Sequence, residues 1–521
     1  MTSLNNTVVS PVAPASNVVA LPKKATVQIV ESAFDIKQKK TEYDVLLGMD
    51  VLVEKSIDEL VKTGLIFDRG NILVCIDRDN AVHQLNKVTI RLILSKLASF
   101  VKTTYNKGAS VTEPVNCPSY IGETIASMTK WRDMPIIDAV TDHPVLTSDN
   151  KLIGSGYNKS TKTFGRFDDA NFNISANPTF EDAIKSLEEV QKLLQTFEFE
   201  GAGDESATLS AMLTAVSRPV LSTALLTLID APMSGSGKGY LGGLLAKLAC
   251  NAVHPAKQLP DNFDEIRKVI TSSLLSAKPV LFFDELAMSE IDCPSIRTLA
   301  TAEIFSDRML GSNRDIDVST KTFCICTGNN ISPTADTARR MLHIRLNPMC
   351  ENPSSRQFSY DAETEMTAKR DEFVSHLLTI QRAFLLANSR GETTKPAQAI
   401  GGFKDWDLMC RQPILWLTGV DPCQRMLETM KSNPAKNDLM VMLNAWVEAF
   451  GDTPTKAGEA VKNEGFRTVC EDYMKRRPGM QINSILVANW IKKHKGQVVD
   501  KRFFDEHSFY QGSPFYIVKS I

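Results

Sequence analysis

Short apolar runs that end in polar side chains recur through the middle of the chain. They cover residues 227–231, 278–283, 321–326 and 341–346. An interior strand of a parallel sheet is apolar on both faces, and its carboxyl end lies at the sheet edge where ligands bind. The pattern therefore predicts an α/β core with a parallel sheet over residues 216–350.

A mixed pattern precedes this core. Helical periodicity at 44–63 and 88–105, with a strand pattern at 72–76, predicts a mixed α/β domain over residues 26–170. This domain contains no evident set of catalytic residues, which favours recruitment of a partner or contact with DNA. Residues 1–25 combine Asn, Ser, Thr, Val and Pro with little periodicity, so we expect a disordered tail there.

Helices are expected on both sides of the core. Apolar residues at helical spacing over 178–197 and 205–217 predict a helical linker at 171–215, which in a ring-forming protein would serve as an oligomerisation collar. Further helical patterns predict a helical segment over 351–445 and a separate domain over 446–521.

The last domain combines three helical patterns with strand-like stretches at 503–504 and 515–518. Helices followed by a hairpin describe a winged helix. Basic residues on and after its third helix suit a surface that faces DNA, although the helix dipole alone also favours lysines at a helix end. The basic residues are Lys492, Lys493, Lys495, Lys501 and Arg502.

A glycine-rich turn follows the run at 227–231 and leads into a helix of small residues. Converging backbone N–H groups bind phosphate when glycines allow positive φ, and a lysine neutralises the β- and γ-phosphate oxygens. The turn therefore predicts an ATP site in which Lys238 holds the phosphates. The expected nucleotide-binding residues are Pro232, Ser234, Gly235, Ser236, Gly237, Lys238, Gly239 and Tyr240.

This turn departs from the pattern G-x-x-x-x-G-K-[ST] at two positions. Pro232 stands at the first glycine, and Gly239 stands where a Ser or Thr hydroxyl would hold Mg²⁺. Either Asp284 and water hold the ion alone, or hydrolysis is slow or absent.

Two acids end the run at 278–283. We expect Asp284 to hold Mg²⁺ and Glu285 to polarise the attacking water, because phosphoryl transfer depends on positioning and charge neutralisation.

Amides and arginines complete the candidate site. Asn329, or less favourably Asn330, would sense the γ-phosphate at the end of the run at 321–326. Arg339 or Arg340 would reach across from an adjacent subunit and stabilise charge in the transition state.

These motifs carry a resemblance to a known family. The block 230–346 resembles the AAA+ ATPase core of replicative helicases of phages, plasmids and integrated mobile elements, which are related to superfamily 3 viral helicases. The matching pieces are Ala-Pro-x-x-Gly-Ser-Gly-Lys, Phe-Phe-Asp-Glu-Leu, Ser306-Asp-Arg-Met-Leu-Gly311, Thr-Gly-Asn-Asn and Asp-x-x-Arg-Arg. Similarity also extends to residues 401–422 and to 144–158.

The resemblance implies a ring, with a hexamer expected, that uses ATP and Mg²⁺ to move along single-stranded DNA and open forks. In this family an insert before the sensor strand projects into the pore and grips the phosphate backbone. Arg314, near the tip of a predicted hairpin with Gly-Ser-Asn at its turn, and Lys321 are the candidates here. A separate primase or initiator protein is the expected partner.

Composition narrows the expected partners. The 521 residues carry a formal net charge of −2, so contact with nucleic acid must come from local basic clusters. The ten cysteines show no C-x-x-C pair or zinc-like spacing with His, which indicates reduced thiols. Without a membrane-spanning apolar stretch or a signal-peptide pattern, we expect a cytoplasmic protein with no membrane partner.

Two other functions fit the same residues. One is an origin-binding initiator or helicase loader that uses ATP only as an assembly switch. The other is a DNA-binding scaffold with a degenerate nucleotide pocket. ATP turnover with and without DNA, and unwinding of a forked duplex, separate the three.

Overall fold

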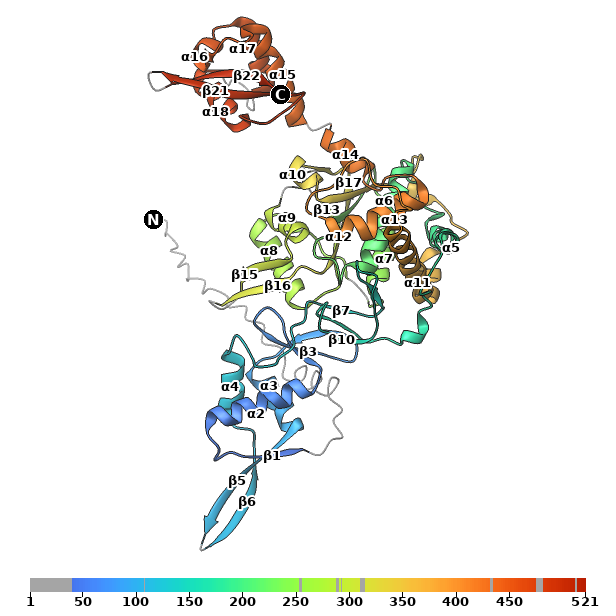
Figure 1. Ribbon diagram of the computed structural model, residues 1–521, viewed down its shortest axis with the longest axis vertical. Helices are drawn as coiled ribbons and strands as arrows, with labels where there is room; N and C mark the ends of the chain where they lie inside the picture. The colour runs from blue at the N-terminus through green and yellow to red at the C-terminus, as the bar shows by residue number, and fades with distance from the viewer. Residues whose placement is uncertain are drawn as a thin grey trace, which may run out of the picture.

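The computed structural model (Figure 1) describes most of the chain beyond its N-terminal segment. The described residues are 40–106, 108–252, 255–286, 290–291, 293–309, 314–431, 434–474, 481–510 and 513–521. The tail expected at 1–25 and the turn expected at 311–313 therefore lie outside them. No helix among the described residues is both long and apolar enough to cross a membrane.

A parallel sheet forms the centre of the molecule, as the apolar runs predict. Its strands are β12 (Leu226–Ala231), β13 (Val280–Leu286), β17 (Phe323–Asn329) and β19 (Met341–Arg345). They lie in the order β13-β17-β12-β19, and every neighbouring pair is parallel. Strand β17 thus separates the strand of the glycine-rich turn from the strand of the two acids.

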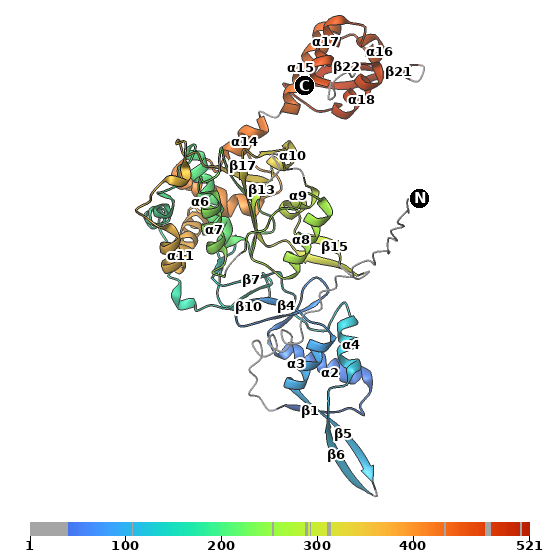
Figure 2. The same cartoon turned by 180° about the vertical axis from the view of Figure 1, so that it is seen from behind.

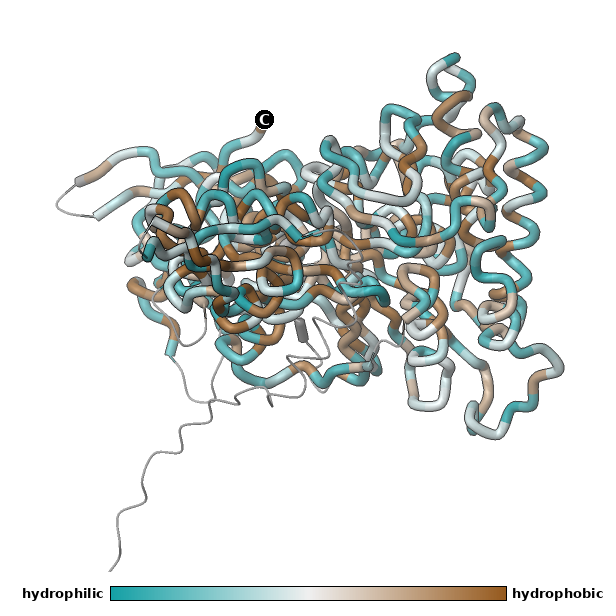
Figure 3. Tube along the Cα trace, turned by 90° about the horizontal axis from the view of Figure 1, so that it is seen from below, coloured by the Kyte–Doolittle hydropathy of each residue, from teal (hydrophilic) through white to brown (hydrophobic). Residues whose placement is uncertain are grey.

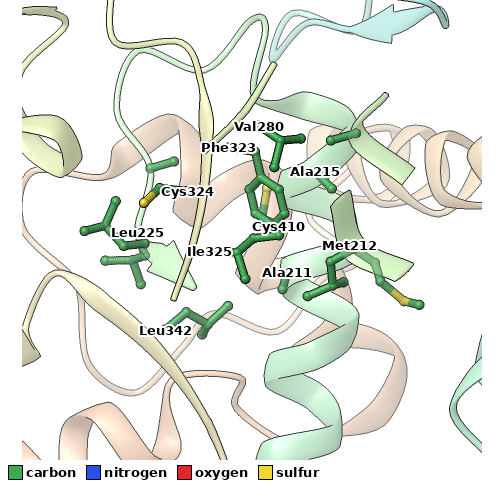
Figure 4. Packing of buried hydrophobic residues seen from close by; sticks show 14 of the residues in the cluster. Ala211, Met212, Ala215, Leu225, Val280, Phe323, Cys324, Ile325, Leu342 and Cys410 are labelled. Atoms are coloured by element: carbon green, nitrogen blue, oxygen red, sulfur yellow. The ribbon is translucent and has the colours of Figure 1, made fainter. Parts of the chain in front are cut away.

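Alternating side chains of β17 fill both faces of this sheet. Figure 4 shows Phe323 and Ile325 near Ala211 of helix α6 (Ala202–Ser217), while Cys324 lies on the opposite side of the strand. Cys324 and Cys326 interact with each other on that side. Burial on both faces explains why the strand reads as an unbroken apolar run. Apolar segments gather in the crowded centre of the chain trace in Figure 3.

Helices cover the central sheet on both faces. The long helix α11 (Ala362–Ser389) has non-helical backbone angles at Lys369, where it is kinked. It packs against α5 (Phe180–Gln191), whose helical pattern the sequence predicts correctly. The other helices of this region are α7 (Lys238–Ala249), α8 (Phe263–Leu275), α9 (Pro294–Thr301), α10 (Ala335–Ala338), α12 (Lys404–Trp406), α13 (Gln412–Thr418) and α14 (Gln424–Lys431).

An antiparallel pair, β15 (Ile304–Arg308) and β16 (Asp315–Ser319), lies beside this core. It corresponds to the hairpin predicted between the acids and the sensor strand. The remaining short strands here are β14 (Glu290–Ile291) and β18 (Ser332–Pro333), which pair in parallel.

The N-terminal region has its own apolar core and differs from the prediction at one helix. Helix α3 (Lys87–Leu97) ends well before residue 105, so the helix expected over 88–105 is wrong in its second half. Residues Ala98–Asn106 instead form strand β5, because an alternating stretch rich in Val, Thr and aromatic residues favours extended backbone. Strand β5 pairs with β1 (Thr41–Asp44) and with β6 (Ala109–Val115).

The β5–β6 ribbon projects from the end of the molecule opposite the C-terminus in both Figure 1 and Figure 2, and every residue of β6 is exposed. The other elements before the core are α2 (Met49–Lys62), β2 (Ile66–Asp68), β3 (Leu73–Ile76), β4 (Val82–Gln84), α4 (Ser119–Ser127), β7 (Ala139–Thr141), β8 (Val145–Leu146), β9 (Leu152–Ile153), β10 (Gly156–Asn158) and β11 (Thr163–Gly165).

The C-terminal region builds a third core around Trp446, which packs edge-on against Phe466 and Phe504. Its helices precede a β-hairpin, as the sequence predicts. The helix expected from residue 455 begins two residues later, because Thr455–Lys456 pair with the hairpin as β20. The elements are α15 (Pro434–Phe450), α16 (Ala457–Ala460), α17 (Glu464–Met474), α18 (Ser484–His494), β21 (Arg502–Tyr510) and β22 (Ser513–Ser520).

Candidate nucleotide-binding site

The glycine-rich turn joins the end of β12 to the start of α7. Gly235 and Gly237 have φ angles of 75° and 92°, a left-handed conformation that glycine adopts without steric cost. Gly237 is the N-cap of α7, so the free N–H groups of the first helical turn begin at Lys238. A turn of this kind before a helix N-terminus is a ready-made anion site. The local geometry thus fits the predicted phosphate cradle.

Lys238 lies at the carboxyl edge of the sheet. Its Nζ donates hydrogen bonds to Asn329 Oδ1 at 2.7 Å and to Met233 O at 3.1 Å. Burial lowers the pKa of Lys238, while the nearby charges of Asp230, Asp284 and Glu285 oppose that shift. The structure therefore brings together the lysine and the amide that the sequence assigns to the γ-phosphate.

Asn330 is directed elsewhere. Its Oδ1 accepts a hydrogen bond from Arg345 at 2.9 Å, and its Nδ2 donates to Pro232 O at 3.1 Å. Arg345 also pairs with Asp230, which is fully buried on β12. Burial raises the pKa of Asp230, but nearby His343, a hydrogen bond from the Ile331 N–H and the Arg345 charge hold it below its usual value. Asn330 thus links Arg345 to the backbone of the turn at Pro232.

The two acids stand at the end of β13 and share a partner on β17. The Thr327 hydroxyl donates to Asp284 Oδ1 and accepts a hydrogen bond from the Glu285 N–H at 2.9 Å. Glu285 is exposed and has a φ of 56°, uncommon for a residue with a side chain. Sequence reasoning missed Thr327. Its signal is a hydroxyl at the carboxyl end of an otherwise apolar strand.

Gly239 faces the first of these acids. A Cβ added at Gly239 would lie 3.5 Å from both Asp284 Oδ1 and Asp284 Oδ2. Mg²⁺ in nucleotide sites is bound through one or two carboxylates, phosphate oxygens and water. One half-buried carboxylate beside the turn fits that donor set. No group of three or more His, Cys, Asp or Glu residues suited to a metal occurs in the described part of the chain.

The candidate arginines are paired within their own chain. Asp336 Oδ1 accepts hydrogen bonds from Arg339 Nη2 and Arg340 Nη1, each at 2.7 Å, and Asp336 Oδ2 lies 3.4 Å from Arg297 Nε. Hydrogen bonding to Arg340, more than to Arg339, holds the pKa of Asp336 below its usual value. Arg339 is half exposed, whereas the Arg340 side chain is largely covered.

A cavity of about 350 Å³ opens next to the turn. Aromatic rings dominate its wall: those of Phe197 and Tyr240 lie 5.8 Å apart at 31°, and Tyr240 Oη donates to Asp361 Oδ1 at 2.7 Å. Four of the lining residues, Gly235, Ser236, Gly237 and Tyr240, are among the predicted nucleotide-binding residues. Sequence reasoning missed the rest of the wall, because those residues come from segments before and after the motifs. The lining residues are Thr196, Phe197, Gly235, Ser236, Gly237, Tyr240, Arg356, Phe358, Tyr360 and Asp361.

The residues expected to contact DNA from the core are engaged inside the subunit. The Arg314 guanidinium donates to the carbonyl oxygens of Ser127 and Met128 at the end of α4. Lys321 Nζ lies 3.3 Å from Asp138 Oδ2, and burial lowers its pKa. These contacts give both side chains a structural role in joining the N-terminal region to the core, and their contact with DNA stays a prediction.

The C-terminal basic residues lie on exposed surface, and some have acidic partners. Lys492 and Lys493 stand in the last turn of α18. Lys495 pairs with Glu506 at 2.8 Å, and Arg502 pairs with Asp500 at 3.0 Å. Lys501 directly precedes β21 in an exposed position. The structure places these residues around one helix end and one hairpin, as the sequence predicts.

Comparison with known proteins adds two distant structural likenesses. No family model and no curated protein matches the chain. The NrS-1 C-terminal region in its A-form apo structure aligns over 89% of this chain and 99% of that chain, with 10% identity and a TM-score of 0.38. The active helicase Cch of SCCmec type IV aligns over 88% and 97%, with 10% identity and a TM-score of 0.30. At these values neither likeness assigns a fold family or an activity, so the function rests on the site.

Proposed function

We propose that the protein is an ATP-driven DNA helicase with an AAA+ core, which assembles into a hexameric ring. The observation that carries the proposal is the convergence of Lys238, Asn329 and the pair Asp284–Glu285 at one edge of a parallel sheet, beside an aromatic cavity. Groups that bind phosphate, position water and neutralise charge are what phosphoryl transfer requires.

The phosphates of ATP would occupy the turn. Backbone N–H groups at the start of α7 donate to them, and the Lys238 ammonium exchanges its contact with Asn329 for a phosphate oxygen. Asn329 then donates through its amide to the γ-phosphate or to the attacking water. Glu285, exposed at the end of β13, accepts the proton of that water. Asp284 would hold Mg²⁺, which supplies neutralisation of the developing negative charge.

The base of ATP would enter the cavity beside the turn. Phe197 and Tyr240 offer ring faces for stacking, and Asp361 offers a carboxylate acceptor for an exocyclic amine. Gly235 and Gly237 belong to both the cavity wall and the phosphate turn. The two parts of one nucleotide are therefore accommodated side by side.

A further positive charge at the γ-phosphate would come from a second subunit. Arg339 or Arg340 leaves Asp336 and contacts the γ-phosphate of the neighbouring site, as an arginine finger does. DNA strands would contact the basic end of α18 and the hairpin after it, which we interpret as a winged helix. Single-stranded and forked DNA are the proposed substrates, with primers supplied by a separate protein.

ATP turnover with and without single-stranded DNA, followed by unwinding of a forked duplex, tests this function. We expect stimulated turnover and strand separation that both require ATP. Lys238→Ala is the negative control, and Lys247→Ala in the last turn of the same helix is the matched positive control. Failure of the wild-type chain to bind any adenine nucleotide would refute the proposal.

One observation favours a second candidate function. Gly239 leaves the space facing Asp284 without the hydroxyl that usually assists Mg²⁺. Slow hydrolysis would suit an origin-binding initiator or a helicase loader that uses ATP as an assembly switch. Nucleotide-dependent assembly without unwinding of the forked duplex would support this candidate over the helicase.

A further inference from the structure

Thr327 is the link between the two acids, although it lies outside the motif that contains them. Its side chain is 1% exposed near the carboxyl end of β17. One hydroxyl donates to the Asp284 carboxylate and accepts from the Glu285 N–H. A single hydroxyl thus fixes one acid through its side chain and the other through its backbone.

The contact with the Glu285 N–H supports an unusual backbone conformation at that residue. A residue other than glycine at a φ of 56° is held in a sparsely populated conformation, which persists when surrounding contacts favour it. The hydrogen bond to Thr327 is such a contact. Loss of the hydroxyl would leave the Glu285 N–H without this acceptor and free the acid to turn away.

The Asp284 carboxylate lies between Thr327 and Gly239. Thr327 bonds to Oδ1, and the position of a Cβ at Gly239 is 3.5 Å from both oxygens. A carboxylate has about four lone-pair sites, so one bond to Thr327 leaves capacity on the side that faces the turn. Hydrogen bonds of this kind orient a metal ligand and commonly change metal affinity or activity 10- to 100-fold when removed.

We propose that Thr327 is a positioning residue that orients Asp284 and Glu285 for metal-assisted ATP hydrolysis, in a site that lacks a hydroxyl at Gly239. The inference rests on the proposed ATPase function. It assigns to β17 two tasks at one edge: Asn329 faces Lys238, and Thr327 holds the acids. A hydroxyl introduced at position 239 would reach the same carboxylate from the other side.

The test measures binding of Mn²⁺, in place of Mg²⁺, with a non-hydrolysable ATP analogue, by electron paramagnetic resonance of the free ion. Thr327→Val removes the hydroxyl and keeps the shape of the side chain. We expect Mn²⁺ affinity to fall roughly 10- to 100-fold, with a loss of kcat in ATP turnover. Thr327→Ser, which keeps the hydroxyl, should retain the wild-type Mn²⁺ affinity and kcat.

The chain offers a matched control on the next strand. Thr227 of β12 is also fully buried, but its Oγ1 has no hydrogen-bond partner in the structure. Thr227→Val should therefore leave Mn²⁺ affinity unchanged. Thr327→Ala guards against a packing artefact, because it also lacks the hydroxyl but adds no methyl group, and it should reproduce the loss seen with Val.

A second-site variant tests the geometry directly. Gly239→Ser places a hydroxyl beside Asp284, so it should recover much of the Mn²⁺ affinity lost in Thr327→Val. Wild-type affinity in both Thr327→Val and Thr327→Ala would overturn the inference and leave the ATPase proposal intact. An equal loss of Mn²⁺ affinity in Thr327→Ser, which keeps the hydroxyl, would also overturn the inference. Absence of nucleotide binding by the wild-type chain would instead refute the proposed function.

Discussion

The two halves of the candidate ATP site differ in how much of their chemistry one chain completes. On the turn side, Lys238 contacts Asn329 and Asp284 contacts Thr327, so the groups engage one another at the sheet edge. On the arginine side, Arg339 and Arg340 are neutralised by Asp336. One half is preorganised, while under the proposed function the other would exchange an internal partner for a phosphate. The proposed sharing of the site between subunits accounts for this difference.

The largest effect should come from the preorganised half. Lys238→Ala removes the ammonium that neutralises the phosphates and leaves Asn329 without its partner. We expect loss of both ATP binding and turnover, measured by fluorescence of a labelled nucleotide and by phosphate release. ATP affinity equal to that of wild type would place the phosphates away from the turn.

A substitution in the arginine half should lower ATP turnover without changing ATP affinity. Because an arginine finger contributes roughly 10³-fold or more to turnover, Arg340→Ala should nearly abolish phosphate release and leave ATP affinity unchanged. Arg297→Ala is the matched control, since Arg297 also contacts Asp336 but comes from α9. Equal loss of binding and turnover in Arg340→Ala would exclude Arg340 from the role of a finger.

The stability of the fold should depend on pH through a buried histidine outside the candidate site. Burial lowers the pKa of His143 to about 4, from 6.5 in an exposed histidine, and Arg370 adds to the shift. Between these values the unfolded chain binds a proton that the native chain does not. The free energy of unfolding is therefore highest above pH 6.5. It decreases as pH falls towards 4, by up to about 1.4 kcal/mol per pH unit.

Urea unfolding at pH 7 and pH 5 measures this loss, which should reach roughly 2 kcal/mol. His143→Gln should flatten the dependence on pH. His507→Gln, at an exposed position of β21, is the control that should keep the wild-type dependence. An unchanged slope in His143→Gln would assign the pH effect to other groups.

The smallest effect should come from Asp336→Asn. The side chains of Asp336 and Arg339 are half exposed, and ion pairs of this kind contribute about 1 kcal/mol or less to stability. We expect unchanged ATP affinity and a small decrease in the free energy of unfolding, read from urea denaturation. A large loss of ATP affinity would mean that Asp336 belongs to the preorganised half.

The sheet and its site motifs were accessible to sequence reasoning because each signal is local. An apolar run buried on both faces followed by Lys238, Asp284 or Asn329 predicts a strand and a polar end without knowledge of the fold. The helix expected over 88–105 was wrong where β5 begins, since pairing with β1 and β6 depends on residues remote in sequence. Local periodicity carries no information about such partners.

Other parts of the site depend on strand order. Thr327 contacts the acids because β17 lies between β12 and β13, and no sequence pattern fixed that order. The cavity wall joins Phe197, from before the sheet, with Tyr360 and Asp361, from after it. The internal partners of Arg314 and Lys321 were equally hidden, since Met128 and Asp138 belong to the N-terminal region.

The kinked helix α11 touches both ends of α7. Near its start, the Glu363 N–H donates to Tyr240 Oη at 2.8 Å, and beyond the kink Arg370 donates to Lys247 O at 2.6 Å and to Asp142 Oδ1 at 2.7 Å. The bend at Lys369 lies directly before Arg370, so the two contacts with α7 come from the two segments of α11 on either side of the kink. One helix therefore ties the first turn of α7, through Tyr240, and its last turn, through Lys247, to Asp142 of the N-terminal region.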